Sequence, residues 1–162
     1  MSNGYAPFIA HMGICCFDIE RMIDFYGKVF DLRLTDRGVG ITFPYKLAFM
    51  SADPSQHHQF ALAQNRPEGS PSTLMQVSFK VNNLAELREA RNRALAHGAS
   101  KMRCISHGNA VSIYCMDPED NIVHEANLNF GRVSIKSLLL YEEMKDDAVR
   151  RGLVLEVDLG GV

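Results

Sequence analysis

The chain of 162 residues has little net charge, few cysteines and no long apolar run. Its 17 basic and 19 acidic side chains give a formal charge of −2, which offers no electrostatic basis for binding nucleic acid or an anionic membrane. No apolar stretch approaches the roughly 20 residues that a helix needs to cross a bilayer. The segment Met1–Pro7 lacks the basic and apolar regions of a signal peptide, so we expect a cytoplasmic protein.

The four cysteines do not form the pattern of a disulfide framework or of a zinc site. Cys15 and Cys16 are neighbours in one apolar run, and Cys104 and Cys115 lie in two later runs that are typical of strands. No pair has the C-x-x-C spacing of structural zinc sites. We therefore expect reduced thiols that are mostly buried.

The chain repeats itself imperfectly, first at an offset of 65 residues and then at an offset of 64. Residues 11–19 (HMGICCFDI) align with residues 76–84 (QVSFKVNNL), and residues 47–60 align with residues 111–124. Such a repeat indicates two similar modules. We expect matching positions to converge near a pseudo-twofold axis within one domain, and we expect function where the match breaks.

Hydrophobic periodicity divides each module into the same series of elements. Module one (residues 8–63) is predicted to contain a strand, a helix with Asp18 as N-cap, and three further strands. Module two (74–130) repeats this order with an N-cap near Asn83, and a linker (64–73) joins the modules. The predicted strands are residues 8–17, 32–36, 46–51, 58–63, 74–81, 102–105, 110–115 and 122–128, and the predicted helices are residues 19–30 and 84–97.

The C-terminal extension (131–162) lies outside the repeat. Apolar and charged residues follow helical spacing up to Arg151, which predicts an amphipathic helix. The stretch Leu153–Val162 is compatible with an added strand, a partner-binding arm or a partly disordered end.

Two motifs in the modules resemble those of a known family. Two tandem βαβββ modules that open with His-x-x-Ile (11–14) and carry Asp-Pro-x-x-Asn (117–121) before the last strand resemble the vicinal oxygen chelate superfamily. Its members include glyoxalase I, extradiol dioxygenases, methylmalonyl-CoA epimerase, and bleomycin- and fosfomycin-resistance proteins. The resemblance covers residues 8 to about 128. It implies an α+β fold in which the modules form a half-open mixed β-barrel around a cavity that holds a divalent metal. It also implies a homodimer.

The resemblance places the four metal-ligand positions of the family at His11, Phe60, Gln76 and His124. Phe60 cannot coordinate a metal, which argues against glyoxalase or epimerase activity. An apolar residue at this position resembles the extradiol dioxygenases, in which two histidines and one glutamate hold the metal.

Further residues resemble the catalytic groups of the extradiol dioxygenases. His58 matches a second-sphere histidine that handles protons, and Tyr114 matches an active-site tyrosine. His107 lies in a loop that resembles the one before this tyrosine, and we expect His107 and Phe60 to contact the substrate. Because His57 and His58 are adjacent in a predicted strand, only one of them is expected to face inward.

Two metal-ligand positions depart from the dioxygenase pattern. Gln76 replaces the second histidine, and His124 replaces the glutamate, with Glu125 one step later. Adjacent strand residues face opposite sides, so only one of His124 and Glu125 faces the cavity. The spacing from Asp117 favours His124, and a β-bulge near residues 120–123 would favour Glu125. The set His11, Gln76 and His124 has no anionic donor, which lowers its expected metal affinity.

These observations predict a metal-dependent enzyme that resembles extradiol dioxygenases and acts on an aromatic vicinal diol. Fe(II) is the first expected metal and Mn(II) the second. One alternative is a metal-free protein that binds a small aromatic molecule, as bleomycin-resistance proteins bind their ligand. Another is a metal-dependent isomerase or lyase of the same superfamily.

Overall fold

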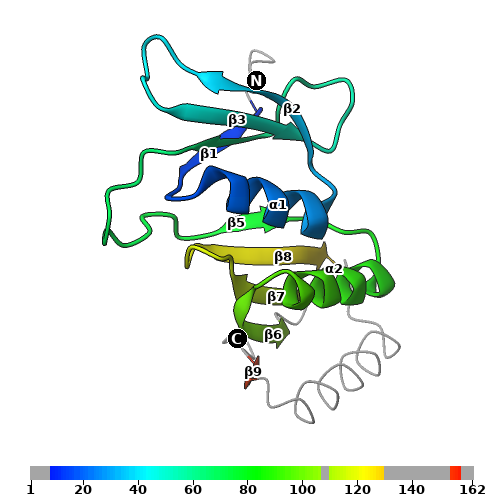
Figure 1. Cartoon of the computed structure of the whole chain (residues 1–162). Coiled ribbons are helices and arrows are strands. Elements are labelled where there is room, and N and C mark those ends of the chain that lie inside the picture. Colours follow the sequence, from blue (N-terminus) through cyan, green and yellow to red (C-terminus); the bar gives the residue numbers. More distant parts are fainter. Residues whose placement is uncertain (1–7, 107–109, 130–153, 158–162) are drawn as a thin grey trace, which may run out of the picture. The chain divides into compact units, whose positions relative to one another are not determined.

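The computed structural model describes residues 8–106, 110–129 and 154–157 (Figure 1). The chain forms two compact units, of which the first comprises residues 1–27 and 31–70 and the second comprises residues 28–30 and 71–162. The division after Ser70 falls within residues 64–76, where the structure contains neither helix nor strand.

The first unit contains one four-stranded mixed sheet and most of one helix (Figure 1). The strand order is β1-β4-β3-β2, with β1 parallel to β4 and the other neighbours antiparallel. In chain order the elements are β1 (Met12–Cys15), α1 (Ile19–Phe30), β2 (Arg33–Val39), β3 (Lys46–Ser51) and β4 (Phe60–Ala63).

The second unit repeats this order and adds a strand. Its sheet has the order β5-β8-β7-β6-β9, in which β5 is parallel to β8 and β9 is parallel to β6. The elements are β5 (Val77–Phe79), α2 (Leu84–Ala96), β6 (Ser100–Ser106), β7 (Ala110–Met116), β8 (Ile122–Asn129) and β9 (Val154–Val157). The predicted α+β fold of two βαβββ modules is confirmed, and β9 matches the added-strand alternative for the C-terminal stretch. The helix predicted up to Arg151 lies outside the described residues.

Both helices begin at the predicted N-caps. The Asp18 Oδ1 atom accepts hydrogen bonds from the backbone N–H groups of Glu20 and Arg21, at 3.1 and 3.2 Å. Asn83 accepts one from the backbone N–H of Glu86 at 2.9 Å, and the Glu86 carboxylate accepts one from the Asn83 side-chain amide at 2.7 Å. The three bonds from backbone N–H groups satisfy donors of the first helical turn, which have no partner inside the helix.

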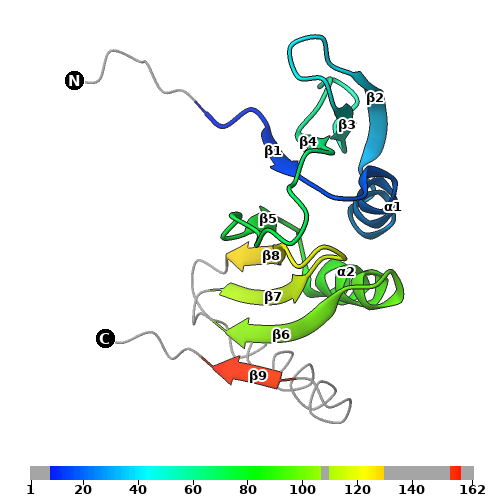
Figure 2. The same ribbon diagram turned by 60° about the vertical axis from the view of Figure 1, so that its left-hand side comes forward.

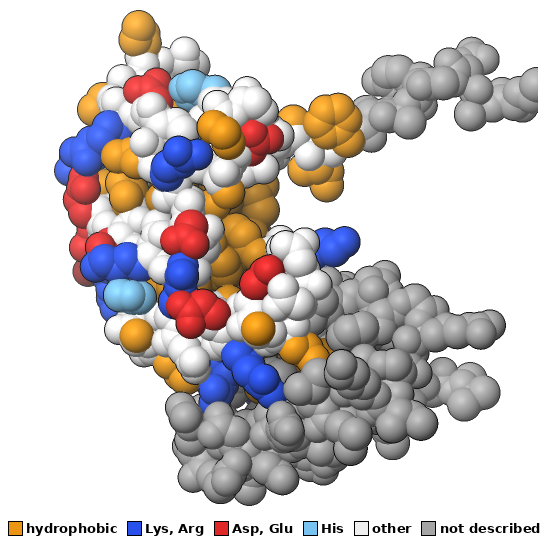
Figure 3. Space-filling view, turned by 90° about the vertical axis from the view of Figure 1, so that its right-hand side faces the viewer, with side chains coloured by type: hydrophobic (Ala, Val, Ile, Leu, Met, Phe, Trp, Pro, Cys, Tyr) orange, Lys and Arg blue, Asp and Glu red, His pale blue; other side chains and the backbone are white. Residues whose placement is uncertain are grey.

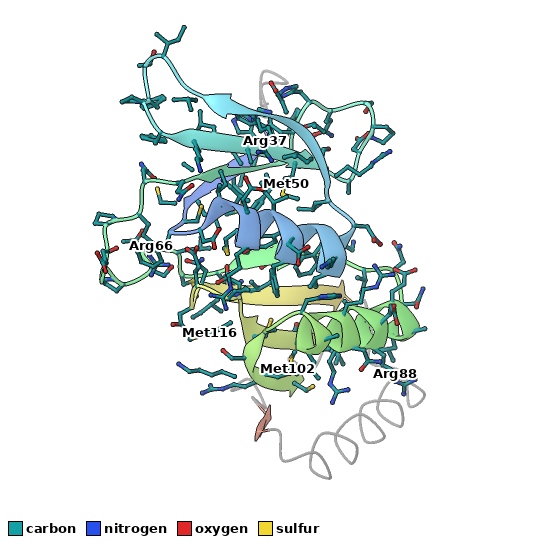
Figure 4. All side chains as sticks on the ribbon, in the orientation of Figure 1. Arg37, Met50, Arg66, Arg88, Met102 and Met116 are labelled. Carbon is teal, nitrogen blue, oxygen red and sulfur yellow. The ribbon has the colours of Figure 1, made fainter. Side chains whose placement is uncertain are left out.

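Alternation along the strands gives the first sheet two faces. Two contacts identify the face that packs against α1. The rings of Phe60 and Tyr26 are 4.5 Å apart, and Arg37 of β2, labelled in Figure 4, forms a 3.3 Å ion pair with Glu20 of α1. The buried sheet residues of this helix face are Ile14, Ala48, Met50, Phe60 and Leu62.

The opposite face of the first sheet carries smaller and more polar groups. In register, Gly13 of β1 pairs with Ala61 of β4, which pairs with Phe49 of β3. His11, one residue before β1, follows the same alternation as Gly13. This opposite face therefore presents an imidazole beside two small residues and an aromatic ring.

The second sheet has the same division into faces. Figure 2 shows α2 along one side of this sheet, and its contacts are with β7 and β8. Tyr114 of β7 pairs with Arg103 of β6 and alternates with the buried neighbours Ile113 and Cys115, so it lies on the face opposite α2. The other face, towards α2, carries buried sheet residues, which include Val77, Met102, Cys104, Ile113, Cys115 and Val123.

The hairpin before the last strand has the same register in both modules. The repeat aligns Met50 with Tyr114, and each pairs with a residue ten positions later, Phe60 and His124. This antiparallel register agrees with the ungapped alignment of Phe60 with His124. The parallel pairs differ from it by one residue, because Met12 pairs with Phe60, whereas its match Val77 pairs with Val123.

The surface and the cysteines agree with the composition. On the side of the molecule drawn in Figure 3, acidic and basic side chains of the described residues are interspersed, without separation into blocks of one sign. All four cysteines are free, with Cys15 exposed and the other three buried, as predicted. Among the described residues, no helix combines the length and apolarity required to cross a membrane.

Candidate functional site

Three histidines of the first unit gather on the sheet face opposite α1. We call His11, His57 and His58 the histidine cluster. The ring centroids of His11 and His58 are 4.3 Å apart, and the Nδ1 atoms of His57 and His58 are 2.8 Å apart. The ring of Phe49 packs beside the pair, at 4.9 Å from His58 and 5.4 Å from His57.

Backbone hydrogen bonds hold the cluster at the edge of the sheet. The N–H of Met12, next to His11, donates to the Gln59 carbonyl at 3.1 Å. The N–H of Gln59 donates in turn to the Met50 carbonyl at 2.9 Å. The residues adjoining His11 and His58 are therefore tied to β3 and to each other, which explains how the two imidazoles meet.

An aspartate organises the turn that carries the histidine pair. The Asp53 Oδ1 atom accepts hydrogen bonds from the Ser55 hydroxyl at 2.7 Å and the Ser55 N–H at 2.8 Å, and Oδ2 accepts one from Gln56 at 3.1 Å. The Ser55 side chain, followed by its backbone N–H, holds the pKa of the Asp53 carboxyl below its ordinary value of 3.8. The connection between β3 and β4 spans residues 52–59, whereas that between β7 and β8 spans only 117–121, so His57 and His58 lie where the repeat breaks.

The environment of His58 favours the neutral imidazole. Partial burial lowers the pKa of His58 below its usual 6.5, and the charges of His11 and His57 lower it further. A neutral imidazole at neutral pH is a proton acceptor, as a general base must be.

The second unit brings other predicted residues to its own sheet. Gln76 lies one residue before β5, and its Nε2 donates to the Ser78 hydroxyl at 3.0 Å. In register, Ser78 pairs with His124, which pairs with Tyr114. Burial raises the pKa of Tyr114 above 10.0, so its phenol keeps its proton at neutral pH.

The predicted bulge near residues 120–123 is absent from the register. The register of β7 and β8 shifts between Val111 and Ile113, opposite residues 125–128 of β8. Ahead of this shift, His124 shares the register of Tyr114, and Glu125 shares that of the buried Ile113. The choice of His124 over Glu125 as a metal ligand stays a prediction.

The structure corrects the prediction for Phe60. Only 2% of Phe60 is exposed, and its ring packs on Tyr26 of α1. A side chain inside the helix–sheet core is not available to a substrate, so Phe60 is a core residue. Ala61 takes its place on the opposite face and likewise has no donor for a metal. His107 lies outside the described residues.

The sequence prediction missed the role of His57 and of two neighbours. It began the last strand of module one at residue 58, and strand alternation then separates His57 from His58. In the structure β4 begins at Phe60, so both histidines lie in the turn and both contact Phe49. Asp36, whose Oδ2 lies 3.5 Å from His57 Nε2, gives no sequence signal, because it is an ordinary charged residue of an exposed strand.

Each unit carries, taken by itself, one side chain with a donor that divalent ions accept. In the described residues, no group of three or more His, Cys, Asp or Glu side chains could hold a metal. The ring nitrogens of His11 and the Oε1 atom of Gln76 make no hydrogen bond there and are neutral donors that divalent ions accept. Within the part of the chain that the structure describes, His11 has no acceptor of the kind that usually orients a metal-binding imidazole.

Three solved structures with a similar fold are distant from this chain in sequence. Glyoxalase I of Leishmania major, described as trypanothione-dependent, is 14% identical with a TM-score of 0.59, covering 91% of this chain and 99% of its own. The fosfomycin resistance protein FosX of Mesorhizobium loti is 19% identical with a TM-score of 0.54 (86% and 98% covered). FosX of Listeria monocytogenes, solved with Mn(II) and sulfate, is 16% identical with a TM-score of 0.55 (86% and 99% covered).

These similarities show the fold alone, because all three identities are low. No curated protein matches the chain. The model of the Glyoxalase/Bleomycin resistance protein/Dioxygenase superfamily, in contrast, matches residues 8–124, well over half of the sequence. The chain therefore belongs to the Glyoxalase/Bleomycin resistance protein/Dioxygenase superfamily, the vicinal oxygen chelate group that its two βαβββ modules resemble.

Proposed function

We propose that this protein is a metal-dependent enzyme that acts on an aromatic vicinal diol, with His58 as its general base. The observation that carries the proposal is the contact between His11 and His58, 4.3 Å between ring centroids. It places a neutral imidazole beside the residue that the family resemblance assigns to the metal. The Mn(II) in Listeria FosX supports the metal, and the resemblance to extradiol dioxygenases supports the substrate class.

In this proposal His11, Gln76 and His124 hold the divalent ion, Fe(II) first and Mn(II) second. The ion, when bound, lowers the pKa of substrate hydroxyls that coordinate it. His58 accepts the proton that leaves a hydroxyl, and its lowered pKa keeps it ready to do so at neutral pH. Phe49 offers an apolar wall next to the base, which suits an aromatic ring. Tyr114 keeps its proton and donates a hydrogen bond to a substrate oxygen.

The test combines metal analysis with an oxygen-uptake assay. After anaerobic loading with Fe(II) or Mn(II), we expect close to one ion per chain and oxygen consumption with catechols. His11→Ala should lose both the ion and the activity. The matched control is His97→Ala, which removes an imidazole at the end of α2 in the second unit. Absence of a stoichiometric ion after loading refutes the proposal.

A metal-free binding protein is the second candidate. It is favoured by the wholly neutral donor set of His11 and Gln76 and by the lack of a three-residue metal cluster among the described residues. This candidate predicts that a chelator leaves the melting temperature unchanged while an aromatic ligand raises it. A fall in melting temperature with chelator contradicts it.

A further inference from the structure

Asp36, His57 and His58 form a continuous chain of polar contacts on the first sheet. The Asp36 Oδ2 atom lies 3.5 Å from His57 Nε2, an ion-pair distance. The Nδ1 atom of His57 lies 2.8 Å from the Nδ1 atom of His58, a hydrogen-bond distance. A carboxylate at one end and the proposed base at the other are thus joined through a single imidazole.

The sheet is built so that Asp36 reaches this chain. The register of β2 and β3 shifts between Leu34 and Asp36, which makes Thr35 the extra residue of a β-bulge. Leu34 pairs with Met50 of the helix face, and after the bulge Asp36 pairs with Phe49 of the opposite face. If the strand alternated regularly through Thr35 without a bulge, Asp36 would share the face of Leu34 and point towards α1.

The bulge is itself stabilised. The Thr35 hydroxyl donates a hydrogen bond to the Phe49 carbonyl at 3.0 Å, so the residue that interrupts the ladder still bonds to β3. Beyond the bulge the alternation resumes, and Arg37 makes its ion pair with Glu20 of α1. The bulge therefore aims Asp36, the single acidic residue of β2, at the face that carries the histidine cluster.

A count of hydrogen-bond donors and acceptors assigns the protons of His57 and His58 to particular ring nitrogens. A neutral imidazole has one N–H donor and one bare nitrogen, and a carboxylate only accepts. Asp36 therefore favours the proton of His57 on Nε2, which leaves His57 Nδ1 as an acceptor. Two Nδ1 atoms at 2.8 Å need one proton between them, so His58 supplies it from its own Nδ1.

We propose that Asp36 and His57 are positioning residues that fix His58 as the Nδ1–H tautomer and leave its Nε2 as the proton-accepting atom. A base oriented by a third group is the arrangement that activates nucleophiles in many hydrolases. The assignment of the His58 proton to Nδ1 is independent of the proposed function. Only the use of Nε2 as a catalytic base rests on the proposed function.

The solvent exposure of Asp36 and His57 indicates that their contacts orient His58 rather than stabilise the fold. The side chains of His57 and Asp36 are 59% and 61% exposed, and ion pairs this exposed contribute little to stability. Removing Asp36 should therefore leave the melting temperature nearly unchanged. The same change should alter the proton distribution of His58, which a purely structural role would not do.

The tautomer can be measured by long-range ¹H–¹⁵N correlation in uniformly ¹⁵N-labelled full-length protein. Chelator is present and the pH is above the imidazole range, so all rings are neutral and metal-free. In the wild type we expect a protonated Nδ1 and a bare Nε2 on His58. In His57→Phe the acceptor is gone, and His58 should shift towards the Nε2–H form that free imidazole side chains prefer. Asp36→Ala should shift it in the same direction, and Asp36→Glu should restore it.

The control for Asp36→Ala is Glu68→Ala, which removes an exposed carboxylate elsewhere in the first unit. It should leave the His58 signals unchanged. A wild-type His58 with its proton on Nε2 overturns the inference. So does an unchanged tautomer in both His57→Phe and Asp36→Ala, with the amide spectrum showing that each variant is folded.

Activity separates this inference from the proposed function. If catechol turnover is found, Asp36→Ala should lower kcat with little change in KM, by no more than the ~10²–10⁴-fold that a positioned base contributes. If no turnover is found but the tautomers respond as described, the proposed function fails and the positioning chain stands. Full kcat in Asp36→Ala overturns the positioning role.

Discussion

Asp53 sets the shape of the turn that delivers His57 and His58 to the cluster. Its carboxylate accepts hydrogen bonds from the backbone and the hydroxyl of Ser55 and from the Gln56 amide. Asp117 does the same work in module two, where it accepts from the N–H groups of Glu119 and Asn121, both at 2.9 Å. An Asp-Pro turn thus precedes the last strand of both modules, and only module one adds histidines to it.

The hydrogen bonds to Asp53 make a pH prediction. The pKa of its folded-state carboxyl is lowered below 3.8, so its stabilising effect is full above that pH and is lost as the pH falls through the folded-state pKa. Ser55→Ala removes the largest cause of the shift and should raise the pKa of Asp53 towards 3.8. Carboxyl NMR titration measures it.

The matched control for this prediction is Ser70→Ala. The Ser70 hydroxyl donates to the Pro67 carbonyl at 2.6 Å, so it touches no carboxylate. Its removal should leave the titration of Asp53 unchanged. An identical Asp53 titration in wild type and Ser55→Ala would show that the Ser55 hydroxyl has no part in the shift.

At the level of strands, the alternation of β4 puts core residues on one face of the sheet and a neighbour of the histidine cluster on the other. Phe60 and Leu62 are buried on the helix face, whereas Ala61 lies on the face that carries the histidine cluster. Phe60→Ala should lower the free energy of unfolding by about 3–5 kcal/mol, because it empties a packed site against Tyr26. Urea denaturation measures this loss.

Ala61→Ser is the control, since it alters a neighbouring residue of the same strand on the other face. It should change the free energy of unfolding by less than about 1 kcal/mol. A small effect of Phe60→Ala, together with a large effect of Ala61→Ser, would mean that the two faces of β4 have been exchanged.

Element boundaries were predictable where local signals decide them. The Asp18 N-cap and the apolar spacing gave α1 as Ile19–Phe30, and the alternation gave β3 as Lys46–Ser51, both as observed. The orientation of Phe60 was not predictable in this way. It depends on the register of β4 with β1 and β3, and the parallel pairs of the two modules differ by one residue from the match that the repeat gives. The bulge at Thr35, and with it the role of Asp36, is hidden for the same reason.

Across the two modules, the repeat predicts corresponding positions but not their joint geometry. His11 and Gln76 each stand one residue before the first strand of a module, as the alignment implies. The sequence also identifies the chemical difference between them, since an amide oxygen is a weaker donor than an imidazole. Whether both residues bind one ion depends on how the two compact units associate, which no local pattern in the chain encodes.

Gln76→His tests directly whether His11 and residue 76 bind the same metal ion. If His11 and residue 76 bind one Fe(II) ion, exchanging an amide oxygen for imidazole strengthens the site, because imidazole is the better ligand for Fe(II). We expect the apparent dissociation constant to fall by roughly tenfold or more, a change as large as those seen when metal sites are perturbed. Isothermal titration calorimetry, in which the metal is added to the metal-free protein, gives the apparent dissociation constant.

The comparison needs a histidine that is added without joining the site. Met75→His provides it, because Met75 is the 79% exposed neighbour of Gln76 and alternates to the other side of the chain. A second control, Gln76→His combined with His11→Ala, should lose the gain if the two residues share the ion. If Gln76→His binds no tighter than Met75→His, or keeps its gain without His11, then the two modules do not bind a common metal. The metal-free binding protein is then the better account of this chain.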